Sequence, residues 1–297
     1  MQLNSRELVQ YVLQNGVVDQ IPKGELCIND AVLHKTMNVT QAGFEEKVAF
    51  VQTMGLDIFS LSPLCPEGMK SLPDKNEYHY QDVKKWALDT PYFTFAVLDG
   101  AFEWGMRLLG TLEFCSNLRS KLVMDELIAQ VEKLNMYMID KLAAEGINGF
   151  ILADDIAFQQ GLFANPIVLR DLFIPSLARQ AERILIQDLP VFFHSDGNYT
   201  AVIDDIVKIG VSGLQCLEKT AGMHIKQLQE RVGPQVCLWG HLDTDDLERA
   251  VTDPSTREDL ANTARKLARG NKFMLGTTSG LYEAMDMDTL RTLYAGV

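Results

Sequence analysis

A histidine and a carboxylate follow directly on an apolar run in the middle of the chain. Residues 189–193 (LPVFF) have the composition of a buried strand that a proline opens, and the run ends in His194, Asp196 and a glycine turn. Because side chains alternate in direction along a strand, His194 and Asp196 are predicted to point the same way. An imidazole and a carboxylate placed together in this way could bind a divalent metal ion or transfer a proton.

The same order of apolar strand, polar tip, loop and amphipathic helix recurs along the chain. We expect strands at 21–26, 57–62, 93–100, 149–155, 189–194, 212–218, 236–243 and 272–278. We expect helices at 4–13, 41–54, 101–118, 122–145, 165–187, 200–209, 224–231, 244–251 and 256–269, with a kink at Pro175 in the fifth. Residues 63–78 hold three prolines and predict a loop. Eight strands that alternate with helices predict an α/β fold, a single (β/α)8 TIM barrel over residues 1–297.

In such barrels the active site lies at the carboxyl ends of the strands, so the polar residues at those ends are the candidate site. They are Glu25, Asp99, Asp154, Asp155, His194, Asp196, Glu218, His241, Asp243 and Thr277. Two histidines and several carboxylates that converge on one mouth could hold a divalent metal, since His, Asp and Glu are all zinc ligands.

Some of these residues also have a purely structural interpretation. Asp and Glu at strand ends often cap the following helix, which is the alternative for Asp155 and Asp243. Phe102 and Trp104 follow Asp99 and could form the wall of an aromatic pocket, or they could simply pack in the core. The cysteines at 216 and 237 are interpreted as small core residues rather than ligands.

Composition and charge exclude some classes of protein. The formal net charge of -13 argues against binding to nucleic acid or to an anionic membrane, since either would favour a basic face. The five cysteines are scattered without a CxxC pair, which is typical of free thiols in a reducing compartment. The first ten residues read as a polar helix start, and no apolar run approaches 18 residues. We therefore expect a cytoplasmic protein.

Several short motifs together resemble the uroporphyrinogen decarboxylase superfamily, over residues 4 to 294. They are Asn15-Gly16, Asp19 to Pro22, Asp154-Asp155, Gln160 to Leu162, Asn165-Pro166, Pro175, His194 to Asn198, Leu217 to Lys219 and Cys237 to Asp243. The resemblance lies in the order and spacing of these motifs, and it implies a distorted (β/α)8 barrel.

The superfamily has two main branches, which differ in their chemistry. Its decarboxylases use no metal and grip a tetrapyrrole through an arginine-rich motif near the N-terminus, whereas residues 21–26 of this chain hold no arginine. Its other branch consists of zinc-dependent, corrinoid-linked methyltransferases. The coenzyme M enzymes of that branch have a His-x-Cys motif and a distant C-terminal cysteine. This chain keeps the histidine as His194 but has Asp196 in place of the first cysteine and Thr277 near the second.

The resemblance therefore implies a zinc methyltransferase with oxygen and nitrogen ligands. Such ligands leave zinc more Lewis-acidic than thiolates do, which suits the cleavage of an ether. We expect zinc to be held by His194, Glu218 and either Asp196 or His241, and Asp154 or Asp99 to orient the substrate or donate a proton. Substrate contacts are expected from Phe102, Trp104, Asp155 and Thr277. The expected methyl donor is a small methylated compound, an aryl methyl ether, and the expected acceptor is a corrinoid carried by a partner protein.

Three alternatives remain open at this stage. A metal-free decarboxylase that acts on a tetrapyrrole would need a cationic pocket. A methyltransferase that uses an N-methyl donor or passes methyl from a corrinoid to a thiol would share the fold and the zinc. A barrel that only binds a ligand, without catalysis, would have no turnover that a substitution of His194 could abolish.

Overall fold

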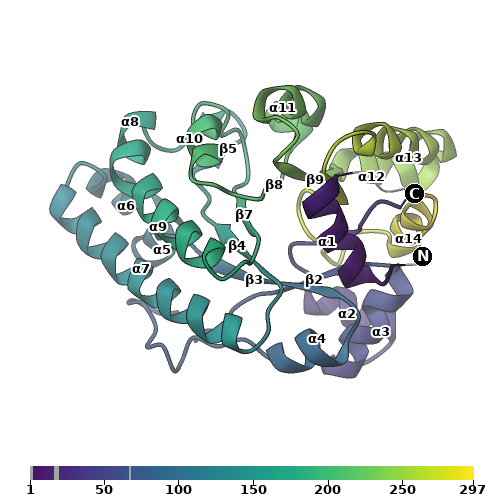
Figure 1. The fold of residues 1–297 in the computed structure, drawn as a ribbon, viewed down its shortest axis with the longest axis horizontal. Coiled ribbons are helices and arrows are strands. Elements are labelled where there is room, and N and C mark those ends of the chain that lie inside the picture. Colours follow the sequence, from purple (N-terminus) through teal and green to yellow (C-terminus); the bar gives the residue numbers. More distant parts are fainter. Residues whose placement is uncertain (1–2, 17–19, 67) are drawn as a thin grey trace.

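Eight short parallel strands form one continuous sheet in the part of the chain that the computed structural model describes, residues 3–16, 20–66 and 68–297 (Figure 1). In the order of the sheet they are β1 (Gly24–Glu25), β2 (Ile58–Leu61), β3 (Phe93–Asp99), β4 (Gly149–Ala153), β7 (Val191–His194), β8 (Gly213–Gln215), β9 (Cys237–Leu242) and β10 (Phe273–Thr277). A parallel bridge between Lys23 and Leu275 brings the first strand against the last. The predicted (β/α)8 barrel is confirmed.

Aromatic side chains fill the barrel interior. The Phe95 ring lies 5.2 Å from that of Phe192 and 5.7 Å from that of Trp239, centroid to centroid. The indole N–H of Trp239 on β9 donates to the carbonyl oxygen of Gly24 on β1 at 3.1 Å, and these two strands flank β10. Because the interior is packed rather than open, a substrate can reach the protein only at an end of the barrel.

The helices surround the sheet. They are α1 (Ser5–Asn15), α2 (Asp30–Met37), α3 (Phe44–Met54), α4 (Val83–Asp89), α5 (Ala101–Leu109), α6 (Thr111–Asn117), α7 (Lys121–Ala144), α8 (Pro166–Val168), α9 (Ile174–Leu185), α10 (Ile203–Lys208), α11 (Ile225–Val232), α12 (Thr244–Thr252), α13 (Pro254–Ala268) and α14 (Met287–Ala295). Figure 1 shows α7 and α9 along one flank and α12, α13 and α14 gathered on the opposite one.

Helix α1 closes the amino-terminal end of the barrel. The predicted capping box is present, since the Asn4 side chain accepts from the Glu7 N–H and the Glu7 carboxylate accepts from the Asn4 N–H, both at 3.0 Å. The N–H of Arg6 donates to the carbonyl oxygen of Pro91, just before β3 begins, and Val9 packs with the interior side chains. The open mouth is therefore at the carboxyl ends of the strands.

The structure differs from the predicted elements at several places. The helix predicted at 101–118 breaks at Gly110, whose positive φ of 76° ends α5 and allows α6 to start. The helix predicted at 165–187 contains a π-helical turn at Leu169–Phe173, which ends two residues before Pro175. Proline has no N–H with which to continue the hydrogen bonds of an α-helix. Helices α2, α4 and α14 and the hairpin β5 (Ala157–Phe158) to β6 (Gly161–Leu162) were not predicted.

A buried carboxyl group joins the barrel wall to the last helix. Glu25 is 1% exposed and accepts hydrogen bonds from the Thr277 N–H at 3.2 Å, from the Thr277 hydroxyl and from the Tyr294 hydroxyl of α14. Burial raises its pKa from 4.5 to about 7, against the opposing effect of these hydrogen bonds. Thr277 was predicted to contact substrate, but its hydroxyl is fully buried and bound to Glu25.

This carboxyl group predicts a pH-dependent stability. A raised folded-state pKa means that the folded state holds a proton that the unfolded state releases, so the stabilisation is complete below pH 4.5 and is lost as the pH rises through about 7. We expect urea denaturation of the wild type to lose on the order of 3 kcal/mol over this range, and Glu25→Gln to remove most of that slope. Substitution of the exposed Glu45 by Gln is the control and should leave the slope unchanged. Equal slopes for wild type and Glu25→Gln would contradict the assignment.

Candidate metal centre

His194 presents one ring nitrogen to the mouth of the barrel. It is the last residue of β7, is 6% exposed, and pairs in register with Gln215, the last residue of β8. The Nδ1 atom of His194 is hydrogen-bonded to the amide oxygen of Gln215. Because an amide oxygen only accepts, Nδ1 is the donor in this contact, and Nε2 is the ring nitrogen that remains for a ligand. This Nε2 atom lies 3.5 Å from Asp155 Oδ1 and 3.9 Å from Asp196 Oδ1.

Cys216 joins His194 and Asp196 in a compact group of three donors. The Nε2 or Nδ1 of His194, a carboxylate oxygen of Asp196 and the Sγ of Cys216 all lie within 4.8 Å of one another. Its Sγ lies 3.0 Å from both Asp196 Oδ1 and the carbonyl oxygen of Thr278, either of which can accept the single thiol proton. Sequence reasoning placed Cys216 inside a strand at 212–218 and interpreted it as a small core residue. The side chain is fully buried, and its place beside His194 and Asp196 makes it a candidate ligand as well. The strand ends at Gln215, and a positive φ of 62° at Cys216 turns the chain.

The charges around Cys216 suit a cation. Burial raises the pKa of its thiol well above the usual value, and the negative charges of Asp196, Glu218 and Asp155 raise it further. A divalent ion would reverse this effect and hold the sulfur as a thiolate. Imidazole nitrogen, carboxylate oxygen and thiolate sulfur are all zinc ligands, and three protein ligands plus one open position is the pattern of a catalytic zinc site.

Glu218 lies beside this group without belonging to it. Its Oε2 atom accepts from the Gly197 N–H at 2.8 Å, and burial together with the charge of Asp196 raises its pKa. Asp155 holds the same loop from the other side, because its Oδ1 accepts from the Asp196 N–H at 2.9 Å. The two carboxylates therefore fix the turn that carries Asp196. Gly197 has a φ of 74°, and a Cβ atom there would lie 2.5 Å from the backbone of Phe158.

The structure does not bring His241 to the group. The side chain lies near Asp246 of α12 and the backbone of Leu260 of α13, and burial lowers its pKa. Its Nε2 is buried and has no hydrogen-bond partner among the described residues. The regular alternation of β9 fails here, because Gly240 and His241 both have positive φ, 154° and 101°.

Asp154 has a structural role in this geometry. It is 1% exposed, and its Oδ1 accepts from the Glu103 N–H at 2.8 Å, in the first turn of α5. Burial raises its pKa well above the usual value. A Cβ atom at Gly100 would lie 2.2 Å from the Asp154 carboxyl carbon, so the glycine lets the carboxyl group approach the start of α5. Asp154 therefore caps α5. Sequence reasoning had raised such a capping role for its neighbour Asp155.

Asp99 is the predicted catalytic carboxyl group that faces the mouth. Arg107 Nη1 donates to its Oδ2 at 2.8 Å, and Arg107 Nη2 donates to Glu103 Oε1 at 3.1 Å. Burial raises the pKa of Asp99, Arg107 lowers it, and the charges of Asp155 and His194 act on it as well. Glu103 and Arg107 were missed because they lie within α5, beyond the strand tip, where nothing in the pattern separates them from solvent-exposed charges.

Phe102 and Trp104 do not line the mouth. Both are fully buried, and the Phe102 ring packs edge to face on Phe114 at 4.8 Å and on Phe173 at 5.2 Å. The Arg107 guanidinium lies 4.6 Å from the centre of the Trp104 ring. The predicted aromatic wall is thus part of the core between the barrel and its helices.

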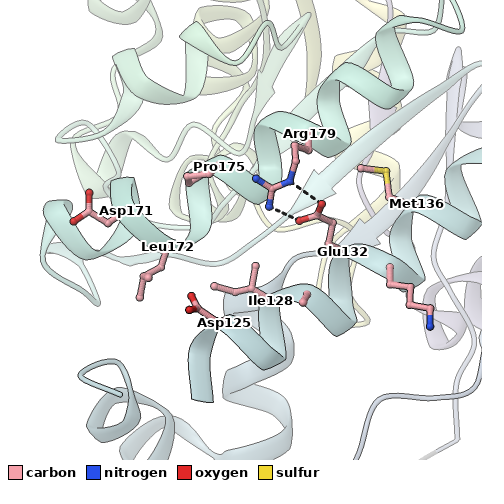
Figure 2. A pocket seen from close by; sticks show the side chains of 10 residues that line it. Asp125, Ile128, Glu132, Met136, Asp171, Leu172, Pro175 and Arg179 are labelled. Atoms are coloured by element: carbon pink, nitrogen blue, oxygen red, sulfur yellow. Dashed lines mark hydrogen bonds and ion pairs between the residues drawn. The ribbon is translucent and has the colours of Figure 1, made fainter. Parts of the chain in front are cut away.

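A groove of about 420 Å³ on the outer flank, between α7 and α9, is separate from these residues (Figure 2). Arg179 holds both carboxylate oxygens of Glu132 in it, with Nε to Oε1 at 2.7 Å and Nη2 to Oε2 at 2.6 Å, and Ser176 donates to the same carboxylate. This paired geometry ties the two helices together, and none of the predicted site residues lines the groove.

Comparison by sequence identifies the family. Residues 116–297, which include His194, Asp196, Cys216 and Glu218, match the uroporphyrinogen decarboxylase (URO-D) family. The chain belongs to this family. No curated protein matches this URO-D family member by sequence, and none of its described helices is long and apolar enough to cross a bilayer.

Solved structures share the fold at low sequence identity. A methyltransferase from Methanosarcina mazei superposes with a TM-score of 0.74 at 14% identity, covering 99% of this chain and 98% of that one. A putative vitamin-B12-independent methionine synthase from Listeria monocytogenes gives 0.52 at 11% identity, covering 94% and 95%. The spore cortex-lytic enzyme SleL of Bacillus megaterium gives 0.53 at 10%, covering 94% and 75%. Similarity at this level shows the fold alone, since SleL is named for a different activity.

The capping role of Asp154 predicts a stability effect that separates it from catalysis. Asp154→Ala should lower the free energy of unfolding by about 1–2 kcal/mol, because the N–H groups at the start of α5 lose their acceptor. Asp154→Asn should recover most of that loss, since an amide oxygen caps nearly as well as a carboxylate. The measurement is chemical denaturation of both variants. Two equally destabilised variants, or two of wild-type stability, would contradict the capping role.

Proposed function

We propose that this URO-D family member is a zinc-dependent methyltransferase, which moves a methyl group from a small methylated donor to the Co(I) corrinoid of a partner protein. The observation that carries the proposal is the group of three metal-type donors, His194, Asp196 and Cys216, at the open mouth of the barrel. Membership of the family and the shared fold of the Methanosarcina mazei methyltransferase support it.

The donor set favours an ether as the methyl source. Bound at the three donors, zinc would act as a Lewis acid toward the oxygen that leaves. One thiolate, one imidazole and one carboxylate donate less electron density than two thiolates would, which keeps the ion electrophilic. The O–CH3 bond breaks with its electron pair left on oxygen, and Co(I) supplies the pair for the new Co–CH3 bond. We therefore propose an aryl methyl ether as donor, because its leaving group is a phenolate.

The residues of the chain take distinct roles in this scheme. Gln215 fixes the His194 ring so that Nε2 faces the metal position. Asp155 and Glu218 hold the Asp196 loop through the Asp196 and Gly197 N–H groups. Asp99, held by Arg107 at the mouth, is the carboxyl group suited to orient the substrate beside the leaving oxygen.

A decarboxylase of a tetrapyrrole is disfavoured by the charges at the mouth. Such a substrate carries several carboxylates and would require free cations. At the mouth, Arg107 is already paired with Asp99 and Glu103. A methyltransferase that passes methyl to a thiol shares the fold and the metal, and only a substrate assay separates it from the ether enzyme.

Metal analysis tests the site. We expect one zinc per chain in the purified wild type by plasma mass spectrometry, and loss of that zinc in His194→Ala and in Cys216→Ala. The matched control is Cys237→Ala, which removes a thiol that is buried in the barrel interior away from the mouth. Full zinc retention in Cys216→Ala would remove the cysteine from the site, and retention in His194→Ala would end the proposal.

Substrate assays test the reaction. With reduced cobalamin as methyl acceptor, a methoxybenzoate should produce methylcobalamin, followed by its absorbance, while a methylamine should not. His194→Ala should abolish this turnover. Turnover with the methylamine alone, or methyl transfer only from methylcobalamin to a thiol, would replace the ether assignment.

The Gln215 contact predicts a change in zinc affinity rather than in fold. Gln215→Leu preserves side-chain volume but releases the His194 ring, and loss of such a partner typically weakens metal binding by about 10- to 100-fold. Competition with a zinc chelator measures the affinity, and Gln130→Leu on the exposed face of α7 is the control. Unchanged affinity in Gln215→Leu would show that His194 is oriented by other contacts.

A further inference from the structure

The outer face of α7 carries a stripe of residues whose spacing is symmetric about Ala129. Leu122 and Asp125 precede Ala129 by seven and four residues, and Lys133 and Met136 follow it by four and seven. Residues at these spacings lie on one face of a helix. Met136 is partly buried, the other four are exposed, and Leu122 is 80% exposed. The stripe therefore has an apolar residue at each end, a charge inside each of them and a small residue at its centre.

This stripe forms one wall of the groove between α7 and α9 (Figure 2). The stripe residues that line the groove are Asp125, Ala129, Lys133 and Met136, and the opposite wall consists of Asp171, Leu172, Pro175 and Arg179. Figure 2 shows Asp125 and Asp171 toward one end of the groove and Met136 toward the other. Between the two ends, Arg179 and Glu132 neutralise each other.

The remaining charges of the groove are separated along its length. Asp125 and Asp171 lie at one end, and Lys133 lies about 12 Å from Asp125 along α7, since each helical residue rises 1.5 Å. Asp125 lies 3.0 Å from the exposed Lys121 of its own helix, and exposed pairs of this kind are weak. Asp171 and Lys133 form no ion pair within the described part of the chain. The groove thus has an acidic end and a basic end.

A two-fold axis at Ala129 would make two copies of this surface complementary. When two α7 helices cross antiparallel at Ala129, the axis exchanges the ends of the stripe. Asp125 of each copy then faces Lys133 of the other, and Leu122 faces Met136 of the other, so that each contact forms twice. The small side chain of Ala129 lets the helices approach within the usual interaxial distance of about 8–10 Å. A second copy therefore supplies the charges and the apolar groups that the groove lacks.

This arrangement would leave both barrel mouths open. Helix α7 connects the parallel strands β3 and β4, so it runs in the opposite direction to them. In an antiparallel pair of α7 helices, the strands of the two barrels therefore point in opposite directions. The two metal centres would lie at opposite ends of the pair, and neither would be covered by the other copy.

We propose that two copies of this protein associate through the α7–α9 groove as a two-fold symmetric dimer. Asp125 of each copy pairs with Lys133 of the other, Leu122 packs on Met136 of the other, and Ala129 lies at the axis. The interface is separate from the metal centre, and the proposal does not depend on the methyltransferase function.

Sedimentation velocity of the full chain tests the dimer. From about 1 to about 100 μM, a species of twice the chain mass should replace the monomer by mass action. Ala129→Arg should stay monomeric, because two guanidinium groups would meet at the axis, and it should fold normally, because arginine is a good helix former. Gln130→Arg, at the next and equally exposed residue but off the stripe, is the control and should match the wild type. A wild type that stays monomeric throughout, or an Ala129→Arg variant that dimerises like it, would overturn the proposal.

Charge reversal tests the antiparallel register. Asp125→Lys and Lys133→Asp should each weaken dimerisation at least about tenfold, because like charges then meet twice. The double variant should recover wild-type association, because both ends have changed sign and again face opposite charges. Thermal midpoints of all variants at low concentration check that the monomer is folded. Single variants that dimerise like the wild type, or a double variant no stronger than either single one, would refute the pairing of Asp125 with Lys133.

Discussion

The hydrogen bond between the His194 ring and the Gln215 amide is the contact on which the site depends. It joins the last residues of two neighbouring strands, β7 and β8, so the parallel register of the barrel sets its geometry. By using Nδ1 as a donor it leaves Nε2 as the ring nitrogen that faces the mouth. Without this contact the imidazole could rotate, and its nitrogen would no longer be held in a fixed position relative to Asp196 and Cys216.

Electrostatics explains why such a mouth would hold a cation. Asp99, Asp155, Asp196 and Glu218 gather there, and burial and mutual repulsion raise the pKa values of Asp99 and Glu218. Arg107 neutralises negative charge only next to Asp99 and Glu103, with which it forms ion pairs. The buried thiol of Cys216 adds a further group that ionises only beside a positive charge. A divalent ion bound by His194, Asp196 and Cys216 would offset both the repulsion between the carboxylates and the penalty for ionising the buried thiol.

The sequence by itself determined the barrel, its eight strands and the end of it that carries the polar residues, because apolar runs and glycine breaks are local signals. It also placed His194 and Asp196 together. Only the tertiary structure decided which other residues join them. Cys216 enters the group because a positive φ ends β8 early, and His241 stays out because two positive φ values turn it toward α12 and α13. Asp154 caps α5, and the Thr277 hydroxyl donates to Glu25; both contacts join residues that are distant in sequence. Backbone turns and long-range hydrogen bonds of this kind follow from packing, and residue spacing does not encode them.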